Sequence, residues 1–174
     1  VANGRAIYIG KLPMTEAERR ITQYWRPYHT QLQALLSRAL LGFGETILID
    51  CHSMPHEAVE GAARGGARRP EIVIGDRFGA SAAPEIVELI ETSFRRAGLV
   101  VARNAPFAGA YITQAYGRPS RRQHAVQVEI DRAIYMDEAS IRPNANFQAF
   151  RRLLRGVVSE VAAIGHRDQQ LAAE

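Results

Sequence analysis

Asp50 and His52 are the first residues of this sequence whose types and spacing could carry chemistry. They directly follow the apolar run of residues 46–49, which predicts that they stand where a buried strand reaches the edge of its sheet. Because side chains alternate across a strand, Asp50 and His52 share one face and Cys51 lies on the other. A carboxylate and an imidazole therefore share a site, unless Asp50 caps a turn and His52 is a structural histidine.

A second chemical feature is the strand predicted over residues 125–130. Gln127 and Glu129 alternate there with valine and isoleucine, whereas a strand buried on both faces should be continuously apolar. One face of this strand must therefore meet a polar environment, because a buried carboxylate without a partner is costly. Two explanations stay open: Glu129 forms a structural salt bridge with an arginine, or it is a catalytic acid or base in a cleft.

The residues around His52 favour a metal ligand over a nucleophile. His52 is one plausible zinc ligand, but a catalytic zinc needs three protein ligands, and His56 lies beyond Pro55 without a zinc-binding spacing. Cys51 points away from His52 on strand geometry, and Ser53 lacks the glycines of a nucleophile elbow. A serine or cysteine triad is therefore not expected here.

The elements that must position these residues follow from hydrophobic periodicity and turn residues. A capping box at Thr15 and Glu18 predicts the start of a helix that Pro27 would kink or divide. The predicted helices cover residues 15–40, 83–97 and 146–164, the strands 46–49, 71–76, 99–102 and 125–130, and a mobile loop 56–70. This alternation predicts an α/β fold: one domain over residues 1–174, with a mostly parallel or mixed sheet flanked by helices.

Composition limits the classes of partner. The 174 residues are 47% hydrophobic and 23% charged, which is typical of a globular protein, and the net charge of +4 comes almost entirely from arginine because Lys11 is the only lysine. The arginines are scattered without interleaved aromatic residues, so we expect no nucleic-acid binding. No apolar run approaches the length of a membrane span. The single cysteine suits a reducing compartment, so we expect a cytoplasmic protein, and the sequence indicates no oligomeric state.

Five separated motifs strongly resemble the N-formylglutamate amidohydrolase family. Their order and spacing match that family across about residues 20–140, and the run 24–29 is similar to the helix that precedes the family's Asp-x-His-Ser strand. The motifs are residues 49–55, 75–79, 104–112, 116–119 and 124–132. Separated matches in the same order are a more specific signal than any single short motif.

The resemblance implies a zinc-dependent amide hydrolase with a fold similar to that of the zinc carboxypeptidases. It implies that His52 is a metal ligand and that Glu129 is the general acid and base. The reaction would be hydrolysis of N-formyl-L-glutamate to formate and L-glutamate in histidine degradation. The substrate's carboxylates call for guanidinium groups and neutral donors, which motif position assigns to Arg77, Asn104, Tyr111, Arg118 and Arg132. Each of these arginines could instead form a structural ion pair.

The chain departs from the family pattern in one respect. Members of the family carry a Pro-His-Ser-Gly motif and an Asp/Arg-rich segment upstream, and residues 1–45 match neither. We therefore expect that the N-terminal portion is missing and that the remaining zinc ligands lie upstream of this chain, or that the chain is a degenerate relative. The alternatives are a related deacylase or carboxypeptidase acting on another acylated amino acid, and a non-catalytic domain that has lost its metal site.

Overall fold

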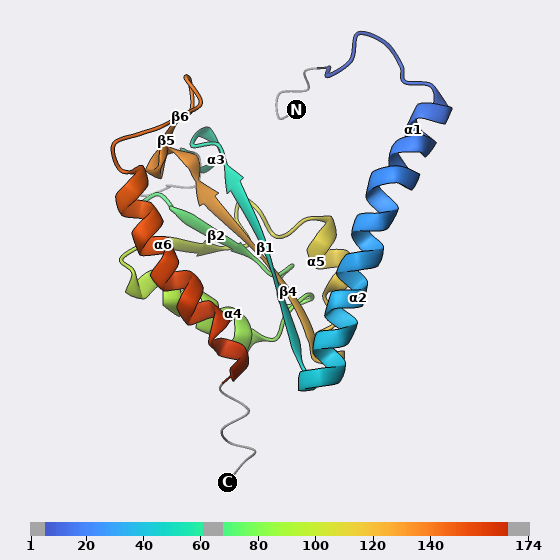
Figure 1. Ribbon diagram of the computed structural model, residues 1–174. Coiled ribbons are helices and arrows are strands. Elements are labelled where there is room, and N and C mark those ends of the chain that lie inside the picture. Colours follow the sequence, from blue (N-terminus) through green and yellow to red (C-terminus); the bar gives the residue numbers. More distant parts are fainter. Residues whose placement is uncertain (1–5, 61–67, 167–174) are drawn as a thin grey trace.

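The computed structural model describes residues 6–60 and 68–166, which build a four-stranded sheet with helices on both faces (Figure 1). The strands are β1 (Thr46–Met54), β2 (Ile72–Gly75), β3 (Val101–Arg103) and β4 (Gln123–Asp131), in the order β1-β4-β2-β3. β1 pairs with β4 and β2 with β3 in parallel, whereas β2 and β4 are antiparallel. The predicted α/β fold with a mixed sheet is confirmed.

The pairing of β1 with β4 places the candidate residues side by side. In this parallel ladder Asp50 lies opposite Gln127, and His52 lies opposite Glu129. Side chains alternate along both strands, so these four polar side chains share one face of the sheet. β1 extends as a strand through Met54, beyond the predicted end at residue 49, so Asp50 and His52 belong to the strand itself.

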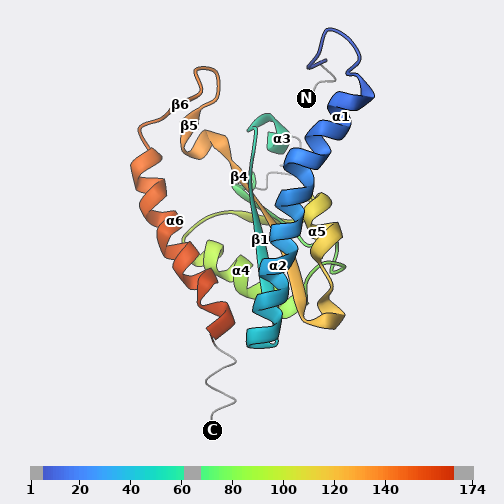
Figure 2. The ribbon, with the colours of Figure 1, turned by 45° about the vertical axis from the view of Figure 1, so that its right-hand side comes forward.

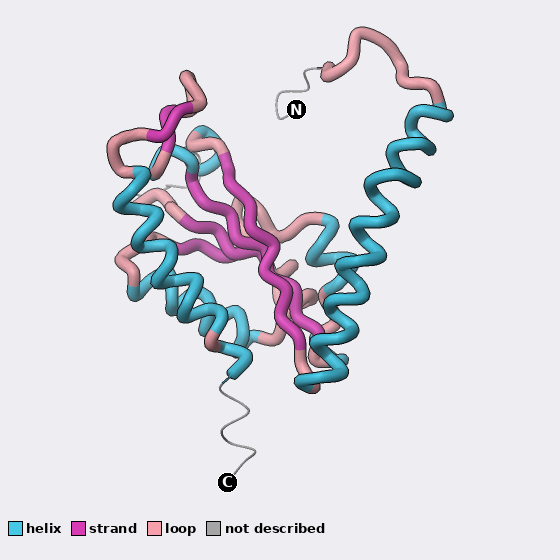
Figure 3. Tube along the Cα trace, viewed as in Figure 1, coloured by secondary structure: helices cyan, strands magenta, loops and turns pink. Residues whose placement is uncertain are grey.

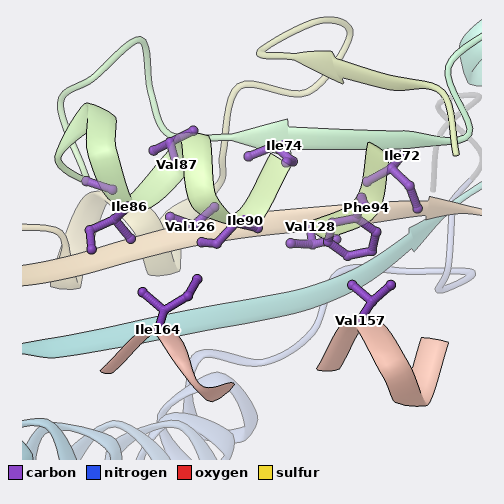
Figure 4. Close-up of a cluster of buried hydrophobic side chains, with 11 residues drawn as sticks. Ile72, Ile74, Ile86, Val87, Ile90, Phe94, Val126, Val128, Val157 and Ile164 are labelled. Carbon is purple, nitrogen blue, oxygen red and sulfur yellow. The ribbon is translucent and has the colours of Figure 1, made fainter. Parts of the chain in front are cut away.

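The opposite face of the sheet carries the main hydrophobic core. The helices α4 (Pro84–Arg96) and α6 (Phe147–Ala162) cover that face, each with an apolar stripe at helical spacing (Figure 4). The buried side chains of this core are Ile72, Ile74, Ala82, Ile86, Val87, Ile90, Phe94, Val126, Val128, Val157 and Ile164. Its packing holds β2 and β4 in register, and so fixes the side chains on the polar face.

Two smaller apolar clusters bracket the polar residues on the other face. At one end, α2 (Arg26–Phe43) lies beside α5 (Tyr111–Tyr116) (Figure 2). Leu36 and Tyr116 from these helices form a buried cluster with Ala125. At the other end, the short helix α3 (Glu57–Glu60) helps to bury Met54 against Val73. The polar residues of β1 and β4 therefore occupy the middle of this face, between two apolar walls.

The N-terminal helical segment differs from its prediction at Thr15, whereas near Pro27 the regular α-helix is divided as expected. α1 (Met14–Arg20) begins after Pro13 without a side-chain cap, so the predicted capping box at Thr15 is wrong. A π-helical turn, Ile21–Trp25, joins α1 to α2, and the three pieces form one continuous helix (Figure 3). Pro27 stands in the first turn of α2; because it has no N–H, the regular ladder of hydrogen bonds is interrupted where the helix widens.

Three further features were outside the sequence prediction or only partly covered by it. α5 lies in a Gly/Tyr-rich stretch that carried no helix prediction, and a small hairpin of β5 (Met136–Asp137) and β6 (Arg142–Pro143) precedes α6. Part of the predicted loop 56–70 is helical as α3, and residues 61–67 of that loop lie outside the described residues. Within the described part of the chain, no helix is both long and apolar enough to cross a membrane.

Candidate active site

His52 stands between two carboxylates at the centre of the polar face. Its Nε2 atom lies 3.0 Å from Asp50 Oδ2, and its Nδ1 atom lies 4.0 Å from Glu129 Oε1. The His52 side chain is 43% exposed, whereas Glu129 is only 7% exposed. The imidazole is therefore the solvent-facing member of the group, with one ring nitrogen directed to each carboxylate.

The contact with Asp50 determines which ring nitrogen of His52 is available. Asp50 Oδ2 is buried and makes no hydrogen bond of regular geometry within the described residues, although His52 Nε2 is at hydrogen-bonding distance. A buried carboxylate oxygen needs a donor, and a proton on Nε2 supplies it after a small rotation of the ring. That tautomer leaves a lone pair on Nδ1, on the side of Glu129.

Glu129 occupies a partly dehydrated position. Burial raises the pKa of Glu129 above its usual value, while the nearby His52 ring and a hydrogen bond from Gln127 act in the opposite direction. Gln127 Nε2 donates to Glu129 Oε1 at 2.7 Å, and Gln127 Oε1 accepts from the backbone N–H of Ala110 at 2.7 Å. A carboxylate with a raised pKa is better suited than an ordinary one both to take and to return a proton.

A cleft of about 560 Å³ opens beside Glu129. Its walls are mostly apolar. Of the polar cluster formed by Asp50, His52, Gln127 and Glu129, it is Glu129 that lines the cleft. The lining residues are Ser53, Met54, Pro55, Glu57, Ala58, Phe107 and Glu129. An apolar cleft with one carboxylate of raised pKa is a common form of enzyme active site.

The donor set fits a metal ion only in part. His52 Nδ1 offers one nitrogen ligand, and Asp50 is placed to orient the ring through its other nitrogen, as carboxylates do behind metal-bound histidines. A catalytic zinc needs three protein ligands. In residues 6–60 and 68–166, no group of three or more His, Cys, Asp or Glu side chains is arranged to hold a metal ion. The described residues therefore do not complete a metal site by themselves.

Two of the predicted substrate arginines lie near the polar cluster. Arg132 follows β4 and donates from Nε to Ser53 Oγ and from Nη2 to the Ser53 carbonyl oxygen, both at 3.1 Å. Its charge is one of the influences that lower the pKa of Glu129, which places it close to that carboxylate. Arg77 follows β2, where Gly75 lies opposite Gln127, and its N–H donates to the Ala108 carbonyl oxygen.

The other predicted substrate residues have different surroundings. The Asn104 amide donates to Asp76 Oδ1 and accepts from the Asp76 backbone N–H, so it braces the turn after β2. Tyr111 begins α5 and is half-exposed, with its ring beside His29. Arg118 caps the end of α5 by donating to carbonyl oxygens. Its backbone pairs with Gln123 at the start of β4, about 20 Å from Glu129 at the strand's rise per residue.

The structure therefore brings together His52, Glu129 and Arg132, places Arg77 just after the end of β2, and keeps Arg118 apart. The substrate roles of these residues stay predictions. The structure also shows a contact that the sequence reasoning missed: His56 Nδ1 lies 2.7 Å from Asp131 Oδ2 at the cleft end of β4. The sequence did offer a sign of this contact, because Asp131 continues the alternation of polar residues at Gln127 and Glu129 along β4. Cys51 lies on the far face of β1, in agreement with the strand argument.

Comparisons with known proteins find N-formylglutamate amidohydrolases and deformylases as relatives of this chain. The family model described as N-formylglutamate amidohydrolase matches residues 1–136. The N-formylglutamate deformylase of Pseudomonas aeruginosa is 33% identical over 172 residues, which cover 94% of this chain and 62% of the relative. The N-formylglutamate deformylase of Pseudomonas putida is 35% identical over 128 residues, which cover 71% of this chain and 45% of the relative. The crystal structure of N-formylglutamate amidohydrolase from Ralstonia eutropha JMP134 superposes with a TM-score of 0.81 at 34% identity, covering 94% of this chain and 58% of that one. The matched part of the chain thus spans between 45% and 62% of the length of these longer relatives.

Proposed function

Because the chain belongs to the N-formylglutamate amidohydrolase family, we propose that it hydrolyses the formyl amide of N-formyl-L-glutamate to formate and L-glutamate. Two of the relatives are N-formylglutamate deformylases, and the similarity to one of them covers 94% of this chain. We place the reaction in histidine degradation, in line with the family resemblance. The observation that carries the proposal is the buried Glu129 carboxylate, which faces both the cleft and His52.

Glu129 performs the proton transfers in this proposal. It accepts a proton from the water that attacks the formyl carbon, and returns that proton to the amide nitrogen as the carbon–nitrogen bond breaks. The water oxygen ends in formate, and the nitrogen leaves as the amino group of glutamate. Burial of Glu129, which raises its pKa, favours both transfers, because the group must be a base in one step and an acid in the next.

Zinc is the metal we propose for this site. When bound, it polarises the amide carbonyl and lowers the pKa of the attacking water. His52 would bind it through Nδ1, while Asp50 fixes the ring through Nε2. We place the remaining ligands outside the residues that the structure describes, since those residues do not complete a ligand set.

The two carboxylates of the substrate call for guanidinium partners near Glu129. Arg132 is the better placed of the candidates, because Ser53, which holds its guanidinium, also lines the cleft. Arg77 approaches the same polar face from the end of β2. Asn104 and Tyr111 stay proposed as neutral contacts, and Arg118 stays a prediction at the far end of β4.

Formate release tests the proposal. We expect the zinc-loaded protein to release formate from N-formyl-L-glutamate faster than from N-formyl-L-leucine, and to leave N-acetyl-L-glutamate almost unchanged. Removal of zinc by a chelator should abolish turnover, and added zinc should restore it. Preference for another acyl group or another amino acid would favour a related deacylase or carboxypeptidase. Absence of any amide hydrolysis would favour a non-catalytic domain.

His52→Ala probes the ligand assignment within the same assay. The variant should lose zinc and turnover while keeping its far-ultraviolet circular dichroism spectrum, because the His52 side chain is 43% exposed and little packing is lost. Cys51→Ala, on the other face of the same strand, is the matched control and should keep both zinc and activity. Normal zinc content in His52→Ala would exclude His52 as a ligand.

A further inference from the structure

We propose that Gln127 is a positioning residue, which holds the Glu129 carboxylate in the orientation needed for proton transfer. This inference rests on the proposed function, because it assigns a role within the same reaction. Gln127 is only 3% exposed, and no reacting group needs to touch it. Its effect on the reaction would pass entirely through Glu129.

Both ends of the Gln127 amide are engaged. Its Nε2 donates to Glu129 Oε1 at 2.7 Å, and its Oε1 accepts from the backbone N–H of Ala110 at 2.7 Å. The side chain thus forms a bridge from the start of α5 to the carboxylate, across the polar face of β4. A buried amide that lost one of these partners would leave a polar atom unsatisfied, so both contacts are strongly maintained.

The Ala110 contact also fixes which way the amide points. A backbone N–H can only donate, so it must face the oxygen of the Gln127 amide. The NH₂ group is then turned to Glu129, whose oxygen must accept. The exchange of oxygen and nitrogen that is ordinarily open to a glutamine side chain is therefore excluded, and the donor is always presented to the carboxylate.

The far anchor of this bridge is itself rigid. Residues 108–110 pack so closely on Gly75 that an added Cβ there would lie 2.6 Å from the Gly109 nitrogen. The Arg77 N–H holds the Ala108 carbonyl oxygen at 2.7 Å, and Thr113 Oγ1 donates to the Ala110 carbonyl oxygen at 2.8 Å. Ala110 therefore cannot follow Gln127 if the glutamine moves, and the position of Glu129 is set by the fold.

Glu129 needs such a support because Arg132, a cation close to the carboxylate, competes for it. A glutamate side chain has three torsions, and without Gln127 it would be free to turn towards Arg132. A displacement of about 1 Å in a reacting group can lower a rate about a hundredfold.

A double-mutant cycle measures this role. Gln127→Met keeps the length of the side chain and removes both hydrogen bonds; we expect kcat of the zinc-loaded enzyme to fall about tenfold to a hundredfold with little change in KM. In the Glu129→Gln background the same substitution should change kcat less than about twofold, because a residue that acts through Glu129 has nothing left to position. A purely structural role would lower both backgrounds equally.

Gln123→Met is the matched control. Gln123 lies on the same strand and face, and donates to the Tyr116 carbonyl oxygen at the far end of β4. Its replacement should leave kcat within about twofold of the wild type, since it loses a comparable hydrogen bond without touching Glu129. An equal loss of kcat in both variants would overturn the inference.

A measurement without turnover separates this inference from the proposed function. In ¹⁵N-labelled protein, a side-chain amide proton of Gln127 should exchange with solvent far more slowly than those of an exposed glutamine. If the wild type hydrolyses a different N-acyl amino acid, the proposed substrate is wrong and the cycle is run on that amide. Rapid exchange at Gln127, or additive effects in the cycle, would overturn the positioning role.

Discussion

We expect Gly75→Ala to displace the backbone of residues 108–109, next to the Ala110 N–H that holds Gln127 in the candidate active site. Gly75 ends β2, and an added Cβ would lie 2.6 Å from the Gly109 nitrogen and 2.7 Å from the Ala108 carbonyl carbon. Ordinary van der Waals contact begins at 3.4 Å, so the facing backbone must retreat by about 0.8 Å, the difference between 3.4 and 2.6 Å. That backbone carries Ala110, whose N–H holds Gln127.

The size of the effect follows from what the methyl group meets. Overpacking in a tight site costs about 1–3 kcal/mol, and we expect the upper half of that range because backbone atoms, not flexible side-chain ends, must move. The same shift would stretch the Ala110–Gln127 hydrogen bond beyond a useful length. Turnover should therefore fall about tenfold or more in addition to the loss of stability.

Urea denaturation and formate release measure the two effects. Gly156→Ala in α6 is the matched control, because a Cβ there has no atom within 4 Å and alanine favours a helix. It should raise the free energy of unfolding by about 0.5–1 kcal/mol, opposite in sign to Gly75→Ala, and leave kcat unchanged. A Gly75→Ala variant as stable as the wild type would refute the reasoning.

Three further outcomes are expected. Val157→Ala should lower the free energy of unfolding by about 2 kcal/mol because Val157 is 3% exposed in the core, whereas Val158→Ala, at a position 57% exposed, should change it by less than about 0.5 kcal/mol in the same urea titration. In the metal-free protein, burial raises the pKa of Glu129 above 4.5, so the folded state keeps a proton that the unfolded state has lost and stability falls as the pH rises through that range. The free energy of unfolding of Glu129→Gln, relative to that of the wild type, should therefore be higher in urea titrations at pH 7 than at pH 4. An unchanged difference between variant and wild type at the two pH values would contradict the buried placement of Glu129. Arg132→Met should raise KM for N-formyl-L-glutamate at least about tenfold and by more than Arg118→Met, and the reverse order would exclude the assignment of the principal substrate contact to Arg132.

The elements with strong periodic patterns were predictable from the sequence. The apolar runs before Asp50 and around Ile72 are strands, and the stripe through Phe150 and Val157 is a helix. α5 could not be predicted because six residues show no helical period, and its stability comes from the burial of Thr113 and Tyr116 against the sheet. The capping box failed because Pro13 already allows the helix to begin one residue before Thr15.

The site was predictable in its residues but not in its geometry. Polar residues on otherwise apolar strands identified Asp50, His52 and Glu129, since nothing in a buried sheet explains them. Their distances depend on the insertion of β4 between β1 and β2, a pairing of distant segments that local patterns do not encode. For the same reason, the sequence did not show that Arg118 lies at the opposite end of β4.

The parallel ladder between β1 and β4 also determines when this protein can begin to work. During synthesis the ribosome releases β1 after α1 and α2. The elements α3, β2, α4, β3 and α5 follow, and only then the partner strand β4. Until then the nascent chain carries His52 without Glu129, and the apolar run of β1 has no neighbouring strand in the described sheet. Distant parallel pairing forms slowly because a long loop must close first. The candidate active site is therefore completed late, and the interval before its completion is when the emerging chain is most exposed to aggregation.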